Sequence, residues 1–360
     1  MKHQLIVIKV GTSSLTAKDG SISSDKIKNI ADQISVLHQE GYPIVLVTSG
    51  SIAAGFRRLG YQNRPVAVAA KQAAAAVGQG LLMEEYTKYF SEHQIVSAQL
   101  LLTRGDFTDK RRYQNAFNAM QVLLEKGAVP IINENDTIAI EELKLGDNDT
   151  LSAQVAAMLH AELLILLTDV DGLYTANPAT HPDATLIRRV EQISDELNEI
   201  AGGAGSANGT GGMLTKLKGA TLATSAGVNV FICSHKRPDA ILHACDGSGI
   251  GTLFCAKQSN MKTKLQWMAF YAHSTGNLYI DEGAKEAITV KEKSLLPAGI
   301  FAMEGDFHKG DVVNVYLRGT HEYLGKGIIN YSKDELTTIL SIGGGHKFQE
   351  AIHRDNWVGA

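Results

Sequence analysis

The type of fold can be inferred from the segment Leu5-Ile6-Val7-Ile8-Lys9-Val10-Gly11-Thr12-Ser13-Ser14. Its apolar run lacks the polar alternation of a half-exposed strand, so it predicts a strand covered on both faces. A lysine near the end of such a strand is costly unless its charge is compensated. A bound phosphate would compensate it, and Gly11 would let backbone N–H groups approach that anion. A lysine that extends its ammonium group to solvent is the competing interpretation.

Similar apolar runs recur up to about residue 255, separated by longer amphipathic stretches. This alternation predicts an α/β fold, a mostly parallel sheet sandwiched by helices. An alanine-rich stretch from Val66 to Val77 would let its helix approach a neighbouring helix or a partner subunit closely. A helix ending near Gly41 is predicted by apolar residues at steps of three and four, which are Ile27, Ile30, Ile34 and Leu37. The further strand-like runs are Pro43 to Val47, Ile95 to Leu101, Val129 to Ile132, Leu163 to Leu167 and Val228 to Ile232.

The pattern changes after Phe254, where glycines punctuate short strand-like pieces such as Asp311 to Tyr316. This predicts a small β-rich domain. The polar stretch Ala256 to Lys264 has neither an apolar period nor core-sized residues, so we place the boundary there. We therefore expect a catalytic domain over residues 1–258 and a β-rich domain over residues 259–360.

Composition argues against two classes of partner. The chain of 360 residues has 34 Lys+Arg against 38 Asp+Glu and a net charge of -4, so nucleic acid is not the expected ligand. Apolar stretches such as Leu163 to Leu167 fall far short of the ~20 residues of a membrane-spanning helix. Met1 to Gln4 runs straight into the first strand, and the 3 cysteines form no C-x-x-C pair. We expect a cytoplasmic protein.

Small residues end the second strand in the stretch Val47 to Gly55, which reads V-T-S-G-S-I-A-A-G. In a parallel sheet, ligands bind beyond the carboxyl ends of the strands, where helix N-termini offer N–H groups to negative charge. Ser49 and Gly50 are therefore candidates to hold a carboxylate or a phosphate. An ordinary turn with a serine helix cap explains the same residues.

Acidic and amide residues follow the fourth strand in two groups, Asn133 to Asp136 and Asp147 to Asp149. Such a cluster could receive an ammonium group, a Mg²⁺ ion, or both. Turns with local Asx hydrogen bonds are the alternative for each group taken singly. Both groups follow apolar segments that point to the same sheet edge, which favours a site.

Two later segments complete the set of candidates. The fifth strand ends at Thr168-Asp169, and a glycine-rich loop from Gly209 leads into a helix with Lys216 in its first turn. The helix dipole disfavours a lysine there, so an anionic ligand is the better explanation. A mobile surface loop explains the glycines equally well, and a loop that closes over a nucleotide would also be mobile when empty.

Six motifs occur in an order and spacing that closely resemble the amino acid kinase family, in particular its members that phosphorylate free glutamate. The resemblance covers residues 1 to about 255, and the later part resembles the PUA domain appended to such kinases. The motifs are I-K-V-G-T-S-S-L from Ile8, V-T-S-G-S-I-A-A-G from Val47, I-N-E-N-D from Ile132, G-D-N-D from Gly146, L-L-T-D from Leu166 with G-L-Y-T from Gly172, and G-T-G-G-M-L-T-K from Gly209.

The resemblance implies that ATP and L-glutamate give ADP and γ-glutamyl phosphate, the first step toward proline, with Mg²⁺ required but no protein ligand assigned to it. Lys9 and Lys216 would contact the phosphates as catalytic residues, and Asp149 would orient them. Glutamate would be held by Ser49, Gly50, Asp136 and Asn148. ATP would be held by Lys9, Gly11, Thr168, Asp169, Thr210, Gly211, Gly212, Met213, Leu214, Thr215 and Lys216.

The family also implies feedback inhibition by proline, assembly as a dimer or tetramer, and hand-over of the product to glutamate-5-semialdehyde dehydrogenase. Two features depart from its pattern. Val170-Asp171 precedes Gly172 where more polar residues are expected, and Leu214 stands where serine is usual. These departures would alter adenine or loop contacts without touching the chemistry.

The residues agree with this chemistry. A carboxylate with a reference pKa of ~4.3 is already ionised at neutral pH, so its phosphorylation needs no general base, and the strand-end motifs contain no histidine. Acetylglutamate, aspartate, carbamate and uridylate kinases are the rivals within the fold, and the loop Asn133 to Asp136 with the C-terminal domain argues for free glutamate. An RNA-binding or RNA-modifying PUA protein is the alternative from another class, but Ala256 to Ala360 shows no basic stripe interleaved with aromatics.

Overall fold

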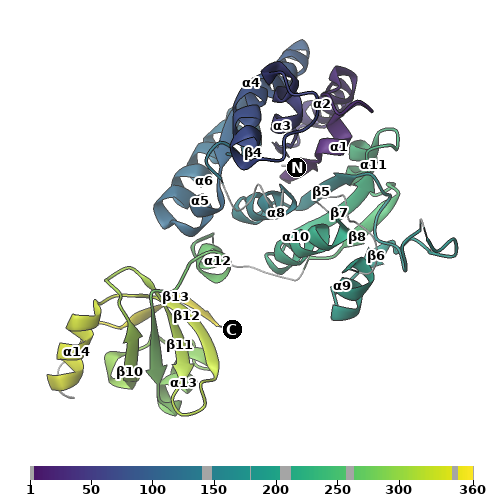
Figure 1. Cartoon of the computed structure of the whole chain (residues 1–360). Coiled ribbons are helices and arrows are strands. Elements are labelled where there is room, and N and C mark those ends of the chain that lie inside the picture. Colours follow the sequence, from purple (N-terminus) through teal and green to yellow (C-terminus); the bar gives the residue numbers. More distant parts are fainter. Residues whose placement is uncertain are drawn as a thin grey trace. The chain divides into compact units, whose positions relative to one another are not determined.

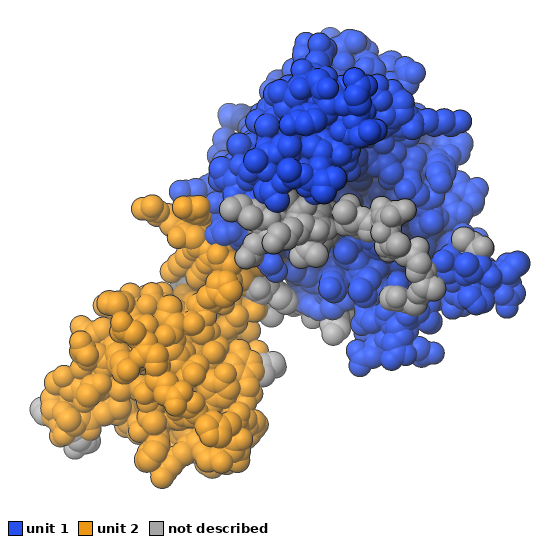
Figure 2. Space-filling view, viewed as in Figure 1, with its two compact units in different colours: residues 1–106, 114–260 blue, residues 107–113, 261–360 orange. Residues whose placement is uncertain are grey.

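The computed structural model describes residues 4–139, 148–178, 180–202, 212–256, 263–342 and 348–359. The chain forms two compact units (Figure 2). Unit 1 comprises Met1–Asp106 and Gln114–Asn260, and unit 2 comprises Phe107–Tyr113 and Met261–Ala360. The expected domain boundary after residue 258 falls within 257–262, outside the described residues, so it stays a prediction. The sequence contained no sign that Phe107–Tyr113 would group with the later part.

Unit 1 is built on an eight-stranded sheet in the order β3-β4-β2-β1-β5-β7-β8-β6 (Figure 1). Every pairing is parallel except that of β7 with β8. The six expected strands are all present, with ends that differ from expectation by at most two residues, and β6 and β8 complete the sheet. The strands are β1 (Ile6–Val10), β2 (Ile44–Val47), β3 (Ser97–Leu102), β4 (Val129–Glu134), β5 (Leu163–Thr168), β6 (Arg189–Val190), β7 (Asn229–Ser234) and β8 (Gly251–Phe254).

Helices occupy most of the connections between these strands. The helix expected to end near Gly41 is α2, whose first turn is capped by the Ser23 hydroxyl accepting from the Lys26 N–H at 3.4 Å. Helix α6 continues from unit 2 into unit 1. The helices are α1 (Thr12–Leu15), α2 (Ser24–Gln39), α3 (Ser51–Gly55), the 3₁₀ helix η1 (Arg57–Leu59), α4 (Val68–Glu92), α5 (Arg104–Thr108), α6 (Lys110–Glu125), α8 (Asn148–Met158), α9 (Asp195–Gly202), α10 (Met213–Ser225) and α11 (Ala240–Asp246).

The alternation of side chains along β1 separates two helical layers. Ile6, Ile8 and Val10 belong to one buried cluster, together with residues of α2, α4 and α11. Val7 and Lys9 point to the opposite face, because successive side chains of a strand alternate. Helices α8 and α10 pack against each other, with α8 also against β1 and α10 against β7 (Figure 1). The expected sheet between helices is confirmed. Among the described residues, no helix has the length and apolar character needed to cross a bilayer.

Helices α3 and α4 approach each other more closely than side chains would allow. A Cβ atom at Gly55 would overlap the Ala74 carbonyl oxygen, and one at Gly78 would overlap the Ser51 carbonyl oxygen. The small residues of the alanine-rich helix therefore serve packing inside the chain. This contact fixes Ser51, the first residue of α3.

We expect Gly78→Ala to lower the free energy of unfolding by roughly 1 to 3 kcal/mol, because the new methyl group forces two backbones apart. Chemical denaturation measures this change. Gly80→Ala is the matched control, since Gly80 is exposed in the same helix with nothing within 4 Å of the added atom. That control should gain about 0.4 to 1 kcal/mol. Equal stability of the two variants would contradict the close helix contact.

Unit 2 contains a five-stranded sheet in the order β10-β9-β11-β12-β13, in which only β9 and β11 are parallel. The β-rich character expected here is confirmed, and β11 is the predicted strand at Asp311 to Tyr316. The strands are β9 (Gly276–Ile280), β10 (Ile300–Gly305), β11 (Val312–Leu317), β12 (Tyr323–Ile329) and β13 (Ile352–Gly359), and the helices are α12 (Thr263–Phe270), α13 (Glu282–Thr289), the 3₁₀ helix η2 (Pro297–Gly299) and α14 (Lys333–Ile342).

Aromatic contacts explain why Phe107–Tyr113 groups with unit 2. The indole N–H of Trp267 donates to the Phe107 carbonyl oxygen at 3.0 Å. The ring of Tyr271 lies 5.8 Å from the rings of both Phe107 and Tyr113, measured between centroids. All four side chains are buried, so the segment shares an apolar environment with α12 and the residue that follows it.

Candidate active site

Three charged side chains meet at the carboxyl end of β1. The Lys9 Nζ atom lies 2.6 Å from Asp149 Oδ1, and the Lys216 Nζ atom lies 3.1 Å from Asp149 Oδ2. The side chains of Lys9, Asp149 and Lys216 are only 8%, 2% and 7% exposed, respectively. Lys9 comes from β1, Asp149 from the first turn of α8 and Lys216 from the first turn of α10. The two lysines that sequence reasoning selected therefore share one carboxylate.

The electrostatics of this group favour an anion. Burial alone would raise the pKa of Asp149, but the charges and hydrogen bonds of Lys9 and Lys216 outweigh it and lower that pKa to about 2. Asp149 is therefore ionised at neutral pH. Two ammonium groups against one carboxylate leave this trio with a net positive charge in a buried place, where an added negative charge is strongly attracted.

The start of α10 lies against the start of α8. The Thr215 hydroxyl is 3.1 Å from Asp149 Oδ2 and 2.8 Å from the Gly212 carbonyl oxygen. A Cβ atom at Gly219 would lie 3.0 Å from the Asp149 carbonyl oxygen, so the absence of a side chain there permits the close helix contact. Of the expected nucleotide-binding loop, Gly212 to Lys216 are described, with Met213 and Leu214 in the first turn of α10. Thr210 and Gly211 lie outside the described residues.

A buried amide network lies beside this group. The Asn148 side-chain amide is 2.7 Å from the Ser49 hydroxyl, 2.7 Å from the Thr48 carbonyl oxygen and 3.0 Å from Asn133 Oδ1. Asn133 in turn donates to Gln79 Oε1 at 2.9 Å. The structure thus brings together Ser49 and Asn148, which are 99 positions apart in the sequence.

Asp136 and Gly50 are linked to the start of α3, next to Ser49 of that network. The Ser51 hydroxyl donates to Asp136 Oδ2 at 2.6 Å. Burial raises the pKa of Asp136, and the Ser51 hydrogen bond and the charge of Arg64 only partly oppose it. Gly50 adopts φ of 102°, a conformation in which side chains are strained, so glycine is needed between β2 and α3.

The remaining candidates lie at the ends of β1 and β5. A Cβ atom at Gly11 would be 3.5 Å from Lys9 Nζ, so the Gly11 backbone passes directly beside that ammonium group. Thr168 ends β5, which pairs with β1. Asp169 follows it and accepts from the His235 ring at 2.8 Å between Nε2 and Oδ1. The strand-end motifs quoted from the sequence contain no histidine, but His235 lies directly after β7, which ends at Ser234.

Sequence reasoning missed several residues that support the candidates. Ser51 lies inside a quoted motif, where its hydroxyl group was a usable signal, and Asn133 belongs to a candidate group but received no role of its own. Gln79 and His235 carry no local signal, since only the packing of α4 and the pairing of β5 with β7 bring them to the site.

A mostly parallel α/β sheet with two buried ammonium groups around one carboxylate at the carboxyl ends of its strands is an arrangement suited to an anionic ligand. A model of the amino acid kinase family matches residues 4–234, and a PUA domain model matches residues 276–347. A glutamate 5-kinase of Streptococcus sanguinis is 56% identical over 358 residues, 99% of this chain and 96% of the relative. A glutamate 5-kinase of Neisseria meningitidis is 54% identical over 362 residues, with the same coverage. The chain belongs to the amino acid kinase family, in its glutamate 5-kinase branch.

A solved structure agrees at the level of the fold. Carbamate kinase from Giardia lamblia bound to AMP-PNP matches 71% of this chain and 99% of its own length, with a TM-score of 0.51 and 17% sequence identity. At that identity the match speaks for the fold alone.

Proposed function

We propose that the protein transfers the γ-phosphoryl group of ATP to the γ-carboxylate of L-glutamate, giving γ-glutamyl phosphate and ADP. The glutamate 5-kinase relatives support this reaction. The observation that carries it is the convergence of Lys9 and Lys216 on Asp149, at 2.6 and 3.1 Å. By the names of these relatives, we place the reaction at the start of proline biosynthesis.

The main barrier in this reaction is electrostatic, because an anionic acceptor must approach a polyanionic donor. The glutamate carboxylate is ionised at neutral pH, so no residue has to remove a proton from it. Lys9 and Lys216 supply positive charge to the transferred group in a buried environment, where such charge acts strongly. Asp149 keeps both ammonium groups oriented before the substrates bind.

The glutamate site is proposed at Ser49, Gly50, Asp136 and Asn148. Asp136 is partly buried and has no cation at hydrogen-bond distance among the described residues, so an arriving ammonium group would stabilise its ionised form. The Ser49 hydroxyl accepts from the Asn148 amide and keeps its own O–H to donate to the α-carboxylate of the amino acid, so Asn148 contributes by orienting Ser49. The γ-carboxylate is then free to face the lysines.

ATP is proposed to lie along Gly11, Thr168, Asp169 and the segment from Thr210 to Lys216. Mg²⁺ commonly reaches such sites on the phosphates. The donor set fits that mode, because Asp149 is already engaged by two lysines and no group of three or more His, Cys, Asp or Glu residues gathers within the described ranges. When bound, the ion would neutralise phosphate charge.

The test is a coupled assay of ADP release with hydroxylamine trapping of the acyl phosphate. Glutamate, N-acetylglutamate, aspartate and carbamate are compared as acceptors. We expect ADP release and a trapped hydroxamate with glutamate. Preference for another acceptor would overturn the substrate assignment and leave the kinase fold untouched.

Proline is expected to lower the initial rate at millimolar concentration, and added glutamate is expected to restore it. The reason is that proline carries the α-carboxylate and a cationic nitrogen, the two groups assigned above to Ser49 and Asp136, but lacks the reacting carboxylate. Initial-rate measurements over both concentrations test this, with alanine as the control solute. Unchanged rates in proline would remove the inhibition from the proposal.

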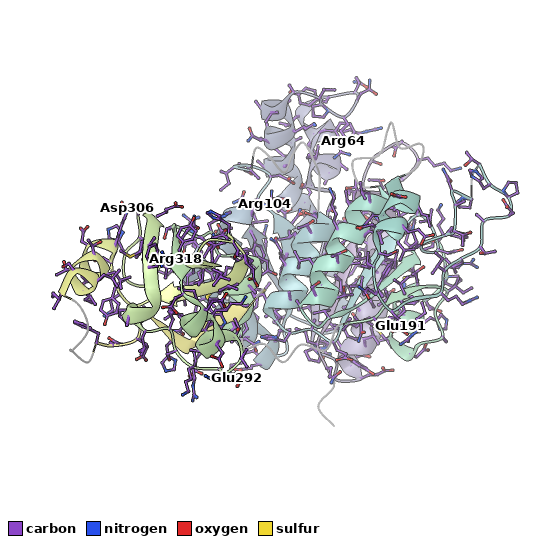
Figure 3. All side chains as sticks on the ribbon, turned by 90° about the horizontal axis from the view of Figure 1, so that it is seen from below. Arg64, Arg104, Glu191, Glu292, Asp306 and Arg318 are labelled. Carbon is purple, nitrogen blue, oxygen red and sulfur yellow. The ribbon has the colours of Figure 1, made fainter. Side chains whose placement is uncertain are left out.

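The family resemblance supports further proposals about context. These are a dimer or tetramer, a cytoplasmic location, hand-over of the product to glutamate-5-semialdehyde dehydrogenase, and the domain division 1–258 and 259–360. An RNA partner finds no support in unit 2, whose side chains carry both signs, such as Arg318, Glu292 and Asp306 (Figure 3).

A further inference from the structure

Two loops leave the sheet side by side at the ends of β5 and β7. The strands are parallel neighbours, with Thr168 opposite Ser234 at their carboxyl ends. The ladder continues one residue further, because the His235 N–H donates to the Thr168 carbonyl oxygen at 2.9 Å. The two loops are therefore fixed relative to each other at their first residues.

The loop after β7 contacts the loop after β5 through three consecutive basic residues, which are His235, Lys236 and Arg237. His235 Nε2 lies 2.8 Å from Asp169 Oδ1, and Lys236 donates to the Asp169 carbonyl oxygen at 3.0 Å. The Arg237 guanidinium makes two parallel bonds to Asp171, of 3.0 Å from Nε and 2.8 Å from Nη2. We call His235, Lys236 and Arg237 the β7 clasp.

The clasp borders a pocket of ≈ 370 Å³ whose lining includes Asp169, Asp171, Tyr174, Lys236 and Arg237. Burial would raise the pKa of Asp169, but hydrogen bonds from His235 and Ser13 lower it. The Arg237 hydrogen bonds lower the pKa of Asp171. Both carboxylates are thus ionised acceptors at neutral pH, which suits the hydroxyl and amino donors of a nucleoside.

We propose that His235 and Arg237 are positioning residues for the nucleoside part of ATP, acting by fixing the carboxylates of Asp169 and Asp171 at this pocket. The inference rests on the nucleotide site proposed above. Asp169 follows β5, the strand next to β1, so a nucleoside here lies at the same sheet edge as Lys9. The hydrogen bonds described for the clasp run to Asp169 and Asp171, so we expect its effect on nucleotide binding and not on phosphoryl transfer.

The experiment compares His235→Ala and Arg237→Ala with the unsubstituted protein. Loss of a hydrogen bond to a charged group should raise KM for ATP about tenfold in each variant, with kcat within about twofold and KM for glutamate unchanged. His235→Gln keeps a side-chain N–H donor and should recover most of the loss. Arg237→Lys should not, because an ammonium group cannot make the paired bonds of a guanidinium. Thermal unfolding establishes that each variant is folded.

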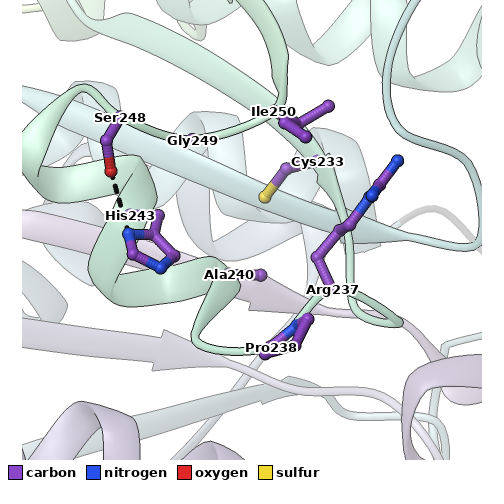
Figure 4. Close-up of a pocket in the computed structure, with 8 residues that line it drawn as sticks. All are labelled: Cys233, Arg237, Pro238, Ala240, His243, Ser248, Gly249 and Ile250. Atoms are coloured by element: carbon purple, nitrogen blue, oxygen red, sulfur yellow. Dashed lines mark hydrogen bonds between the residues drawn. The ribbon is translucent and has the colours of Figure 1, made fainter.

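His243→Ala is the matched control. The His243 Nδ1 atom lies 2.8 Å from the Ser248 hydroxyl (Figure 4). It also lies 3.6 Å from Asp246 Oδ2. His243 lines a different pocket, of ≈ 310 Å³, which also includes Arg237. KM for ATP should be unchanged in this variant. An equal rise in KM for His243→Ala and His235→Ala would overturn the positioning role.

Calorimetric titration with the ATP analogue AMP-PNP separates this inference from the glutamate assignment. The dissociation constant should rise about tenfold in His235→Ala and Arg237→Ala, whatever the acceptor is. If the protein binds AMP-PNP but does not phosphorylate glutamate, the proposed function fails. The positioning role of the clasp is then still tested by the dissociation constants of the variants. Three results would each overturn the positioning role of the clasp. They are unchanged dissociation constants in both variants, no AMP-PNP binding by the unsubstituted protein, and a fall in kcat alone.

Discussion

Lys216→Ala is expected to reduce glutamate-dependent ADP release by a factor of roughly 100 to 1000, with the fold preserved. The loss arises because the transferred phosphoryl group would lose one of the two lysine cations proposed to stabilise it. The fold should survive, since Asp149 remains ion-paired with Lys9 at 2.6 Å. Steady-state kinetics at saturating ATP and glutamate, together with thermal unfolding, measure both parts of this result.

Lys218→Ala serves as the control for Lys216→Ala. Lys218 lies on the same helix two residues later, is exposed, and should be replaceable at no cost to kcat. Full activity of Lys216→Ala would end the assignment of its catalytic role. Activity lost equally in both variants would point to helix α10 as a whole.

Asp149→Asn is expected to lower the free energy of unfolding by about 3 to 5 kcal/mol, because it leaves two buried ammonium groups without their shared counter-charge. Denaturant titration near neutral pH measures the loss. Asp183→Asn removes an exposed carboxylate of the same unit and should change stability by less than about 0.5 kcal/mol. Equal stability of the two variants would contradict the shared ion pair.

The same residue predicts a pH dependence of stability. The pKa of Asp149 falls from 3.8 to about 2 on folding, so its ionised form stabilises the folded state above pH 4. That contribution should be lost as pH falls from about 4 to about 2, where the folded carboxylate takes up its proton. Asp149→Asn should lack this part of the acid dependence. A parallel acid profile for both proteins would assign the loss to other carboxylates.

Much of the fold followed from apolar runs, because a strand buried on both faces leaves a continuous signal in the sequence. The antiparallel strand β8 left no such signal, since four residues that include Gly251 and Thr252 look like a loop. The grouping of Phe107–Tyr113 with unit 2 depends on packing against Trp267 and Tyr271, residues about 160 positions away. No local pattern encodes such a contact.

The candidate site divides in the same way. Lys9 and Lys216 could be selected locally, because each sits where its charge is costly without a partner. Their shared partner could not be derived from spacing, because Asp149 lies 140 positions from Lys9 and 67 positions from Lys216. The link from Ser51 to Asp136 and that from His235 to Asp169 depend on helix packing and strand pairing in the same manner.

The alternation along β1 also limits how this segment can vary in length. Lys9 reaches α8 and α10 because its side chain lies on the face of the sheet opposite to that of Ile8 and Val10. An insertion or deletion of a single residue between Ile6 and Lys9 would turn the ammonium group toward the apolar cluster beneath α2. Active variants of this protein should therefore tolerate conservative substitutions in β1, but not the insertion or deletion of a single residue.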